Sequence, residues 1–173
     1  MSSPLLCAIA AVSADGFVSR DTGVPWDLPA DREHFRSITA GKWLLLGRRT
    51  FQEMLGWFKD HHPMVLTQSS DFRPQVGNVV HTVQSALDLA ASEGAEEVWV
   101  CGGAATYAAA WPLVQKAVIT RVAENLGSGL AFPETCTDEW IATDQFPLHR
   151  TSDREPAAEV ITYQRRGIPE FSR

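Results

Sequence analysis

The sequence predicts a three-layer α/β domain, built on a mixed, mostly parallel sheet of about eight strands with helices on both faces. Three observations lead to this fold class. Short apolar segments alternate with helical segments along the chain, which is the order typical of α/β folds. The first apolar segments are unbroken, as in strands that are covered on both faces. The two segments nearest the C-terminus alternate apolar and polar residues, as an antiparallel pair does.

Length and charge limit the organisation of the chain and its partners. A chain of 173 residues with 45% hydrophobic residues is expected to form one domain, here over residues 1–166, followed by a C-terminal tail at 167–173. The formal net charge is -6 and the basic residues are scattered. Phosphate backbones are held chiefly by clustered Lys and Arg, so we expect no nucleic-acid partner. Our separate expectation is a small-molecule substrate and a monomer or homodimer.

The cysteines and the N-terminal segment indicate the cellular compartment in which the protein is expected. Cys7, Cys101 and Cys136 are an odd number without a C-x-x-C pair, and two of them lie in apolar runs where a thiol behaves as a small hydrophobic group. The apolar stretch 4–12 is too short to span a bilayer and follows no basic region. We therefore expect a cytoplasmic protein with no membrane partner.

The first strand and the connection after it suggest a site for a flat ligand. The unbroken run 5–12 suits a buried parallel strand, and its small residues Ala8, Ala10 and Ala11 leave room for a planar group or for another helix. The segment 13–28 is rich in turn residues and longer than most connections. Long connections in compact domains are often lids.

A helix is expected to begin at Pro29, which is tolerated in a first helical turn. Asp31 and Phe35 are four residues apart and share a face of this helix, which Ile38 and Thr39 continue. Burying a lone carboxylate costs several kcal/mol, so Asp31 on this face implies a partner or a ligand that hydrogen-bonds it. The alternative is a solvated Asp31 that interacts favourably with the positive end of the helix.

The second predicted strand, 43–46, ends at Gly47 and is followed by Arg48, Arg49 and Thr50. Thr50 and Glu53 have capping-box spacing before a short helix at 51–55. Two guanidinium groups and a hydroxyl at a helix N-terminus suit an anion, although a solvated basic turn is equally compatible with this segment.

Three further strands and a helix are expected in the middle of the chain. The strands are 64–67, 79–81 and 97–101, and the helix is 83–92. The last of these strands runs into Gly102 and Gly103, after which a helix is expected from Ala104 to Trp111, before Pro112. This arrangement lets backbone N–H groups approach a pyrophosphate, whereas a glycine pair alone is usually only a tight turn. It is not the G-x-G-x-x-G motif of the Rossmann fold.

Strands at 116–122, 140–146 and 159–165 complete the sheet, the last two as its antiparallel finish. His61 and His62 are adjacent and lack a third placed ligand, so we expect them in a loop and predict no metal site.

Four motifs resemble those of the dihydrofolate reductase family. They occur in the family's order over 5–166 and are the segments 10–16 (AAVSADG), 26–31 (WDLPAD), 47–50 (GRRT) and 101–107 (CGGAATY). The resemblance implies the family's fold and a cytoplasmic enzyme of one-carbon metabolism. It further implies hydride transfer from NADPH to the pterin ring of 7,8-dihydrofolate, giving tetrahydrofolate.

The resemblance also implies the roles of individual residues. Asp31 would orient the pterin, Thr120 would hydrogen-bond its carboxylate, and Trp26 would help to hold the water that delivers a proton. Substrate-binding positions would be Ile9, Ala10, Phe35, Met54 and Cys101. Cofactor-binding positions would be Ala11, Gly47, Arg48, Arg49, Thr50, Thr67, Gln68, Gly102, Gly103, Ala104, Ala105, Thr106 and Tyr107.

One departure concerns the substrate's glutamate tail. Folate reductases usually carry an Arg before the third strand to bind the tail, where this chain has His61 next to Asp60. A neutral imidazole cannot replace a bidentate guanidinium, so the tail would be held differently, for example by Arg32 or Lys59. The alternatives are an NADPH-dependent reductase of another pteridine or of a phosphoribosylaminopyrimidine, or a non-catalytic nucleotide-binding protein.

Overall fold

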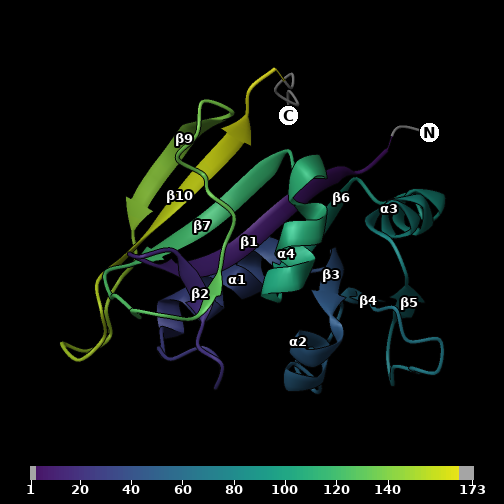
Figure 1. Cartoon of the computed structure of the whole chain (residues 1–173), viewed down its shortest axis with the longest axis horizontal. Helices are drawn as coiled ribbons and strands as arrows, with labels where there is room; N and C mark the ends of the chain where they lie inside the picture. The colour runs from purple at the N-terminus through teal and green to yellow at the C-terminus, as the bar shows by residue number, and fades with distance from the viewer. Residues whose placement is uncertain (1–2, 168–173) are drawn as a thin grey trace.

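The computed structural model describes residues 3–167 and contains a mixed sheet of eight strands (Figure 1). From one edge to the other these are β5 (Asn78–Val80), β4 (His62–Leu66), β3 (Trp43–Gly47), β6 (Glu97–Gly102), β1 (Leu5–Ser13), β7 (Lys116–Val122), β10 (Ala158–Arg165) and β9 (Trp140–Pro147). The strands from β5 to β7 are parallel to one another, and β10 is antiparallel to both of its neighbours. The predicted fold class is confirmed.

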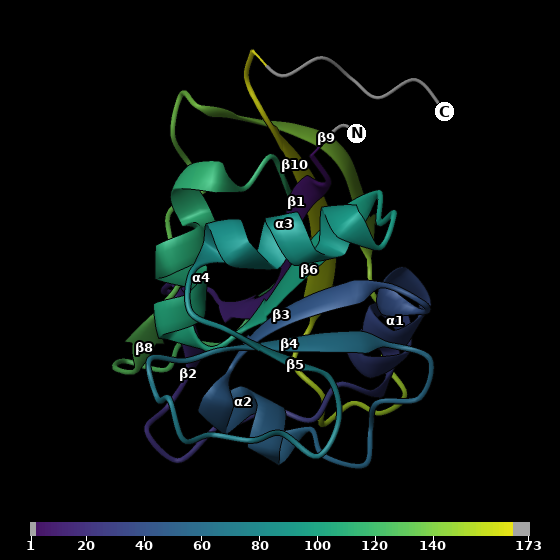
Figure 2. The same ribbon diagram turned by 90° about the vertical axis from the view of Figure 1, so that its right-hand side faces the viewer.

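Helices cover both faces of the sheet. They are α1 (Pro29–Thr39), α2 (Arg48–Glu53), α3 (Val83–Ser92), α4 (Ala104–Ala110) and the short 3₁₀ helix η1 (Trp111–Leu113). Seen from the β5 edge, α4 lies to the left of the sheet and α1 to its right (Figure 2). The predicted three layers are therefore present.

The unbroken apolar strands supply the core on both faces. In β1, Leu6 and Ala8 pack on the side of α3 and α4, whereas Cys7 and Ile9 pack on the side of α2. Successive side chains of a strand point to opposite faces, so a strand buried on both sides must be apolar throughout. The sheet is packed on both faces in this way, and its strand ends can position a site.

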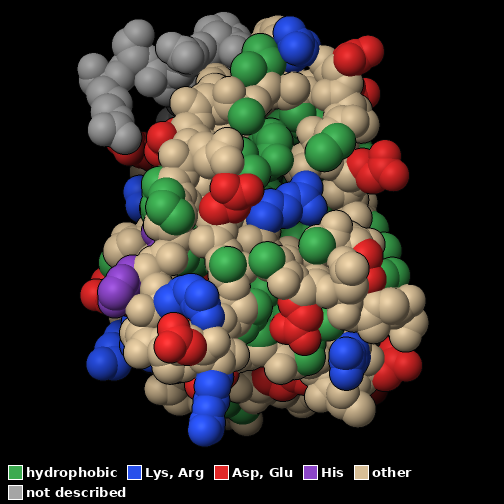
Figure 3. All heavy atoms as spheres, turned by 90° about the vertical axis from the view of Figure 1, so that its left-hand side faces the viewer, with side chains coloured by type: hydrophobic (Ala, Val, Ile, Leu, Met, Phe, Trp, Pro, Cys, Tyr) green, Lys and Arg blue, Asp and Glu red, His purple; other side chains and the backbone are tan. Residues whose placement is uncertain are grey.

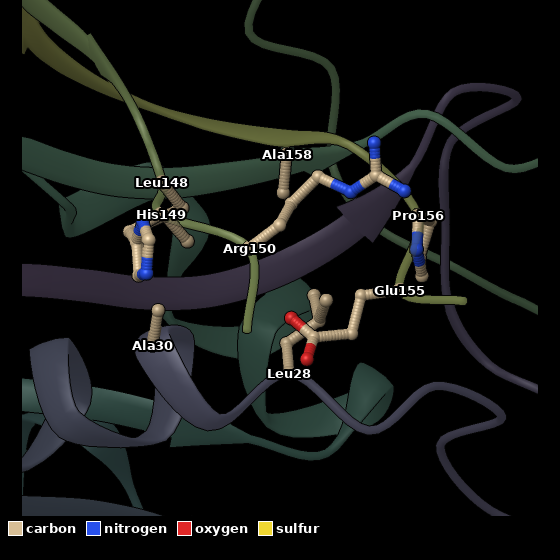
Figure 4. Close-up of a pocket in the computed structure, with 8 residues that line it drawn as sticks. All are labelled: Leu28, Ala30, Leu148, His149, Arg150, Glu155, Pro156 and Ala158. Atoms are coloured by element: carbon tan, nitrogen blue, oxygen red, sulfur yellow. The ribbon is translucent and has the colours of Figure 1, made fainter. Parts of the chain in front are cut away.

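At the other edge of the sheet, β9 is largely exposed. Ile141 and Phe146 are 43% and 38% exposed. Figure 3 views the molecule from the left of Figure 1, where β9 lies, and shows hydrophobic side chains among acidic and basic ones. The loop from β9 to β10 brings Leu148 and Pro156 beside Leu28 and Ala30, so that a narrow cavity borders the start of α1 (Figure 4).

The chain departs from the predicted elements at several turns. Helix α2 begins at Arg48 with Gly47 as its N-cap, so Thr50 lies inside the helix and the predicted Thr50–Glu53 capping box is wrong. Arg48 and Arg49 themselves form its first turn. A capping box occurs instead at α3, between Thr82 and Ser85.

Two short strands and one histidine were also not anticipated. The loop 13–28 contains β2 (Phe17–Ser19), which pairs with β8 (Leu130–Ala131). His62, expected in a loop, is the first residue of β4. The predicted tail lies outside the described residues apart from Gly167. Within 3–167, none of the helices combines the length and the apolar character needed to cross a bilayer.

Candidate functional site

The parallel strands β1, β3 and β6 have their carboxyl ends on the same side of the sheet. The polar residues of the candidate site gather at these strand ends. Asp31, in the first turn of α1, meets Thr120 of β7, whose Oγ1 donates a hydrogen bond of 2.5 Å to Asp31 Oδ1. Thr120 is only 2% exposed. Asp31 therefore has the partner that its place on an apolar helix face requires.

Opposing influences act on the Asp31 carboxyl. Burial raises its pKa above the ordinary value, because a charged carboxylate is poorly solvated there. The hydrogen bond from Thr120 and the proximity of His34 lower its pKa, and burial outweighs both. Within residues 3–167 no group donates a hydrogen bond to Asp31 Oδ2, so this oxygen remains available to a ligand.

A cleft of about 240 Å³ opens beside Asp31. It is lined by Asp31, Arg32, Phe35, Glu53, Met54 and Trp57. Asp31 is therefore not the only carboxylate of the cleft, but the Glu53 side chain is 58% exposed and paired with Arg49 at 3.2 Å. Asp31 is the buried acid of the two.

The predicted substrate-binding side chains largely converge. Ile9, Phe35, Met54 and Cys101 belong to one apolar cluster on the α2 side of the sheet. Ala10 packs into the cluster on the opposite face, so only its backbone can face the cleft. An apolar cleft with one buried acid suits a flat, partly polar ring.

The starts of α2 and α4 lie close together at the ends of β3 and β6. A Cβ on Gly47 would approach Thr106 Oγ1 to 2.9 Å, and one on Gly103 would approach Thr50 Oγ1 to 3.2 Å. Gly47 and Gly103 are the N-caps, so no side chain caps the first N–H groups of either helix. Two uncapped helix N-termini side by side favour an anion.

Further predicted cofactor positions surround these glycines. Tyr107 donates a hydrogen bond of 2.7 Å to the Ile9 carbonyl and ties α4 to β1. Thr67 and Gln68, which follow β4, both hydrogen-bond His81 after β5. Ala104 and Ala105 form the first turn of α4, and Ala11 of β1 is the register partner of Thr120.

The two arginines of α2 have different surroundings. Arg49 donates hydrogen bonds to Glu53 and to the Asp21 carbonyl, both at 3.2 Å. Arg48 is exposed, lies 5.4 Å from the ring centroid of Phe72 and forms no ion pair with another residue of 3–167. Arg48 is thus the guanidinium that is free to take a phosphate.

The lid-like segment is anchored at its start. The Asp15 carboxylate accepts hydrogen bonds from the backbone N–H groups of Leu126 and Gly127, at 3.0 and 2.7 Å, and from Ser13 Oγ. The Ser13 hydroxyl, followed by the backbone donors, holds the pKa of Asp15 at about 2. Trp26, near the end of the segment, is partly buried, and no hydrogen bond joins it to the rest of the described chain.

His61 does not project into the cleft as a substitute for an arginine. Its side chain is 6% exposed, 5.0 Å from the Trp57 ring, and its Nε2 lies 3.4 Å from Thr39 Oγ1. Of the suggested substitutes, Arg32 lines the cleft but pairs with Asp27, and Lys59 is exposed outside the lining.

Sequence reasoning missed one residue of the cleft lining and one residue that packs on it. Trp57 lines the cleft, and the Arg36 guanidinium carbon lies 5.6 Å from its ring centroid. Arg36 could have been found, because it follows Arg32 by one helical turn. Trp57 carried no such signal, because it belongs to the turn after α2, whose course depends on tertiary packing.

Comparisons with known proteins agree with this geometry. The family model described as dihydrofolate reductase matches residues 5–165. Dihydrofolate reductase type 3 of Salmonella typhimurium is 28% identical over 162 residues, covering 93% of this chain and 98% of the relative. Dihydrofolate reductase of Bacillus subtilis is 29% identical over 136 residues, covering 79% of this chain and 80% of that protein.

A solved structure is also similar. Dihydrofolate reductase from Enterococcus faecalis, complexed with NADP(H) and RAB-propyl, matches with a TM-score of 0.81 and 26% identity. The match covers 94% of this chain and 96% of that one.

Proposed function

Because this chain belongs to the dihydrofolate reductase family, we propose that it reduces 7,8-dihydrofolate to tetrahydrofolate with NADPH, and that Asp31 orients the pterin. The single observation that carries the proposal is the buried Asp31 carboxylate in an apolar cleft, with one oxygen held by Thr120 and the other available. Matches to relatives named dihydrofolate reductase favour this substrate over another pteridine or a phosphoribosylaminopyrimidine. They also disfavour a non-catalytic nucleotide-binding protein.

Asp31 acts on the ring that accepts the hydride. Its carboxylate accepts hydrogen bonds from the 2-amino and N3–H groups of the pterin, while Thr120 donates to Oδ1 and so fixes the plane of the carboxylate. Charge-assisted hydrogen bonds of this kind are about twice as strong as neutral ones. The carboxylate also favours a protonated pterin, because a positive ring is stabilised beside a buried negative charge.

The apolar walls position the two reactants. Phe35 and Met54 pack against the pterin and its aminobenzoyl extension, and Ile9 and Cys101 complete the wall toward the sheet. NADPH supplies the hydride from C4 of its nicotinamide. The protein aligns the rings and keeps water out except at the lid, where Trp26 holds the water that passes a proton to the ring nitrogen.

The cofactor's phosphates lie over the starts of α2 and α4. Gly47, Gly102 and Gly103 leave room for the pyrophosphate at the paired helix N-termini. Thr50 and Thr106 place hydroxyls beside it. Arg48, which forms no ion pair within 3–167, takes the adenosine 2′-phosphate and thereby favours NADPH over NADH.

Arg36 takes over the contact with the glutamate tail. His61 is occupied by Trp57 and Thr39 and is buried, so it cannot reach a tail at the mouth of the cleft. Arg36 lies over the ring of the lining residue Trp57, where its guanidinium can meet a carboxylate. A hydrogen bond to a charged group contributes about 1.5–3 kcal/mol, so losing it weakens binding roughly tenfold or more.

Residues 1–166 work as one domain in the cytoplasm, as a monomer or homodimer. The main sheet draws its strands from Leu5 to Arg165, so the two ends of this range share one core. The thiols of Cys7, Cys101 and Cys136 are free, which suits a reducing compartment.

The test follows NADPH oxidation spectrophotometrically with three substrates: dihydrofolate, a dihydropterin without the glutamate tail, and a phosphoribosylaminopyrimidine. Saturable turnover with dihydrofolate, and much less with the other two, is expected. Faster turnover of the aminopyrimidine than of dihydrofolate would refute the assignment.

The tail contact is tested by Arg36→Gln. We expect this change to raise KM for dihydrofolate roughly tenfold or more and to leave KM for the tail-less dihydropterin unchanged. Arg150→Gln is the matched control, because Arg150 lies in the loop between β9 and β10 (Figure 4). Equal effects of Arg36→Gln on both substrates would contradict the contact.

A further inference from the structure

His61 is a buried histidine in the connection between α2 and β4, where the chain is otherwise close to solvent. Its side chain is only 6% exposed, although its neighbours Lys59, Asp60 and His62 are exposed. The mechanism proposed above gives this ring no task. Buried polar side chains are normally hydrogen-bonded, so the partners of His61 show what the ring holds together.

Both ring nitrogens of His61 have a partner. The backbone N–H of Lys59 donates to Nδ1 at 3.3 Å, so Nδ1 is unprotonated and Nε2 carries the hydrogen. Nε2 lies 3.4 Å from Thr39 Oγ1. The Thr39 hydroxyl donates its own hydrogen to the Phe35 carbonyl at 2.8 Å, so its oxygen can accept from Nε2–H. The imidazole is in this way tied to α1.

The surroundings keep this imidazole neutral, as the two hydrogen bonds require. Burial is the largest influence and lowers the pKa of His61, and the neighbouring His62 lowers it further. Asp60 Oδ1, which lies 3.6 Å from Nδ1, raises the pKa without outweighing burial. The pKa of His61 therefore lies below its ordinary value.

The ring of His61 packs on Trp57, a residue of the cleft lining. The two ring centroids are 5.0 Å apart and the planes are at 30°. Trp57 also meets the ring of Phe35 on α1, with centroids 5.1 Å apart. His61, Thr39, Phe35 and Trp57 thus form a closed circuit of contacts between α1 and the turn after α2. Without His61 the circuit is open, and Trp57 has fewer restraints.

Arg36 depends on where Trp57 lies. This exposed residue of α1 has its guanidinium carbon 5.6 Å from the Trp57 ring centroid. A single cation–π contact at an exposed site is weak, so it cannot by itself fix two side chains that come from different elements. The position of the guanidinium therefore depends on what else holds the Trp57 ring.

We propose that His61 is a positioning residue, which holds the Trp57 ring against α1 and thereby places the Arg36 guanidinium for the glutamate tail of the substrate. This rests on the proposed function, in which Arg36 binds that tail. His61 itself touches neither the substrate nor the cofactor. The imidazole serves the tail contact through its neighbour and not through a charge of its own.

A histidine that only filled space beside Trp57 would behave differently. Its loss would loosen the cleft for every substrate, with or without a glutamate tail. A residue that acts through Arg36 affects only substrates that carry the tail, and only while Arg36 is present. These two requirements separate positioning from packing.

The first test compares KM for dihydrofolate with KM for a dihydropterin without the tail in His61→Gln. Glutamine keeps a polar side chain but removes the ring, so Trp57 loses its contact. We expect KM for dihydrofolate to rise roughly twofold to tenfold, the range that contacts between aromatic rings contribute to affinity. The kcat and the KM for the tail-less dihydropterin should stay unchanged. Equal rises in KM for the two substrates would overturn the proposal.

The second test combines His61→Gln with Arg36→Gln. The double variant should have the same KM for dihydrofolate as Arg36→Gln alone, because His61 then has no guanidinium left to place. A further rise in KM would overturn the proposal. His62→Gln is the matched control, because His62 stacks on Trp43 with centroids 4.9 Å apart, and neither residue lines the cleft. It should leave KM for both substrates unchanged.

A third test needs no turnover. In NMR spectra of the full chain, His61→Gln should shift or broaden the indole N–H signal of Trp57 and leave that of Trp43 unchanged, and His62→Gln should do the reverse. An unmoved Trp57 signal in His61→Gln would overturn the proposal. A moved Trp57 signal, in a protein that does not turn over dihydrofolate, would support the hold of His61 on Trp57 and refute the proposed substrate.

A second variant covers the case in which His61→Gln does not fold. His61→Phe keeps the ring volume and removes only the hydrogen bonds with Lys59 and Thr39, so the ring is no longer fixed to α1. It should raise KM for dihydrofolate and leave KM for the tail-less dihydropterin unchanged. An unchanged KM for dihydrofolate in this variant would overturn the proposal.

Discussion

Thr120 offers a sharp test of how the buried acid is held. Its hydroxyl donates a hydrogen bond of 2.5 Å to Asp31 Oδ1, and the residue is only 2% exposed on β7. The change Thr120→Val removes the donor and keeps the β-branched shape, so the packing of the strand is retained. What changes is the stability of the ionised carboxylate.

The expected size of the effect follows from this one hydrogen bond. A hydrogen bond to a charged group contributes about 1.5–3 kcal/mol. Its loss makes ionised Asp31 roughly tenfold to a hundredfold less populated relative to the protonated form. Because burial already raises the pKa of Asp31, the variant needs a still higher pH to ionise this group.

The assay is kcat/KM for dihydrofolate measured across pH, together with NADPH affinity. We expect a fall in kcat/KM of roughly tenfold to a hundredfold and an inflection at higher pH, with NADPH affinity retained. Thr143→Val on the exposed strand β9 is the matched control and should change neither quantity. A Thr120→Val enzyme with an unaltered pH profile would refute the view that this hydroxyl supports the acid.

Three other changes test the proposed phosphate contact of Arg48, the hydrogen bonds that Asp15 accepts, and the packing of the hydrophobic core at Leu45. Arg48→Gln should weaken NADPH binding roughly tenfold or more and leave NADH binding unchanged, as calorimetry can measure. Asp15→Ala should speed amide hydrogen exchange at Leu126 and Gly127, because the carboxylate that accepts their N–H groups is lost. In the parent protein, the pKa of Asp15 is lowered from 3.8 to about 2. Protection of these two amides from exchange should therefore persist above pH 3.8 and be lost as the pH falls toward 2. Leu45→Ala, at a fully buried position, should cost about 2–5 kcal/mol in urea unfolding. Equal losses of affinity for NADPH and NADH would contradict the expectation for Arg48→Gln. Unchanged amide exchange would contradict that for Asp15→Ala, and an unchanged unfolding midpoint that for Leu45→Ala.

Much of the fold could be predicted because periodicity reflects burial directly. The unbroken run of β1 suited a strand covered on both faces, and the structure places its side chains alternately in two cores. Helix α3 has the predicted bounds, because its apolar stripe faces the sheet. The pairing of Asp31 with Thr120 followed from the family resemblance and not from the pattern.

The predictions failed where tertiary contacts decide local structure. The start of α2 was misplaced because Gly47 caps the helix where the chain leaves β3, which a Thr-x-x-Glu pattern does not reveal. The pairing of β2 with β8 joins segments more than a hundred residues apart and has no local signature. The surroundings of His61 depend on Trp57, whose position is set by the turn after α2. Such contacts cannot be derived from residue spacing.

The most direct measurement is single-turnover hydride transfer by Asp31→Asn with NADPH and dihydrofolate prebound. Asparagine fills the same space and keeps a hydrogen-bonding group, but it removes the buried negative charge that we propose orients the pterin. The account predicts that hydride transfer near neutral pH falls by orders of magnitude while NADPH affinity stays nearly intact. Hydride transfer at a near-normal rate in this variant would contradict the account.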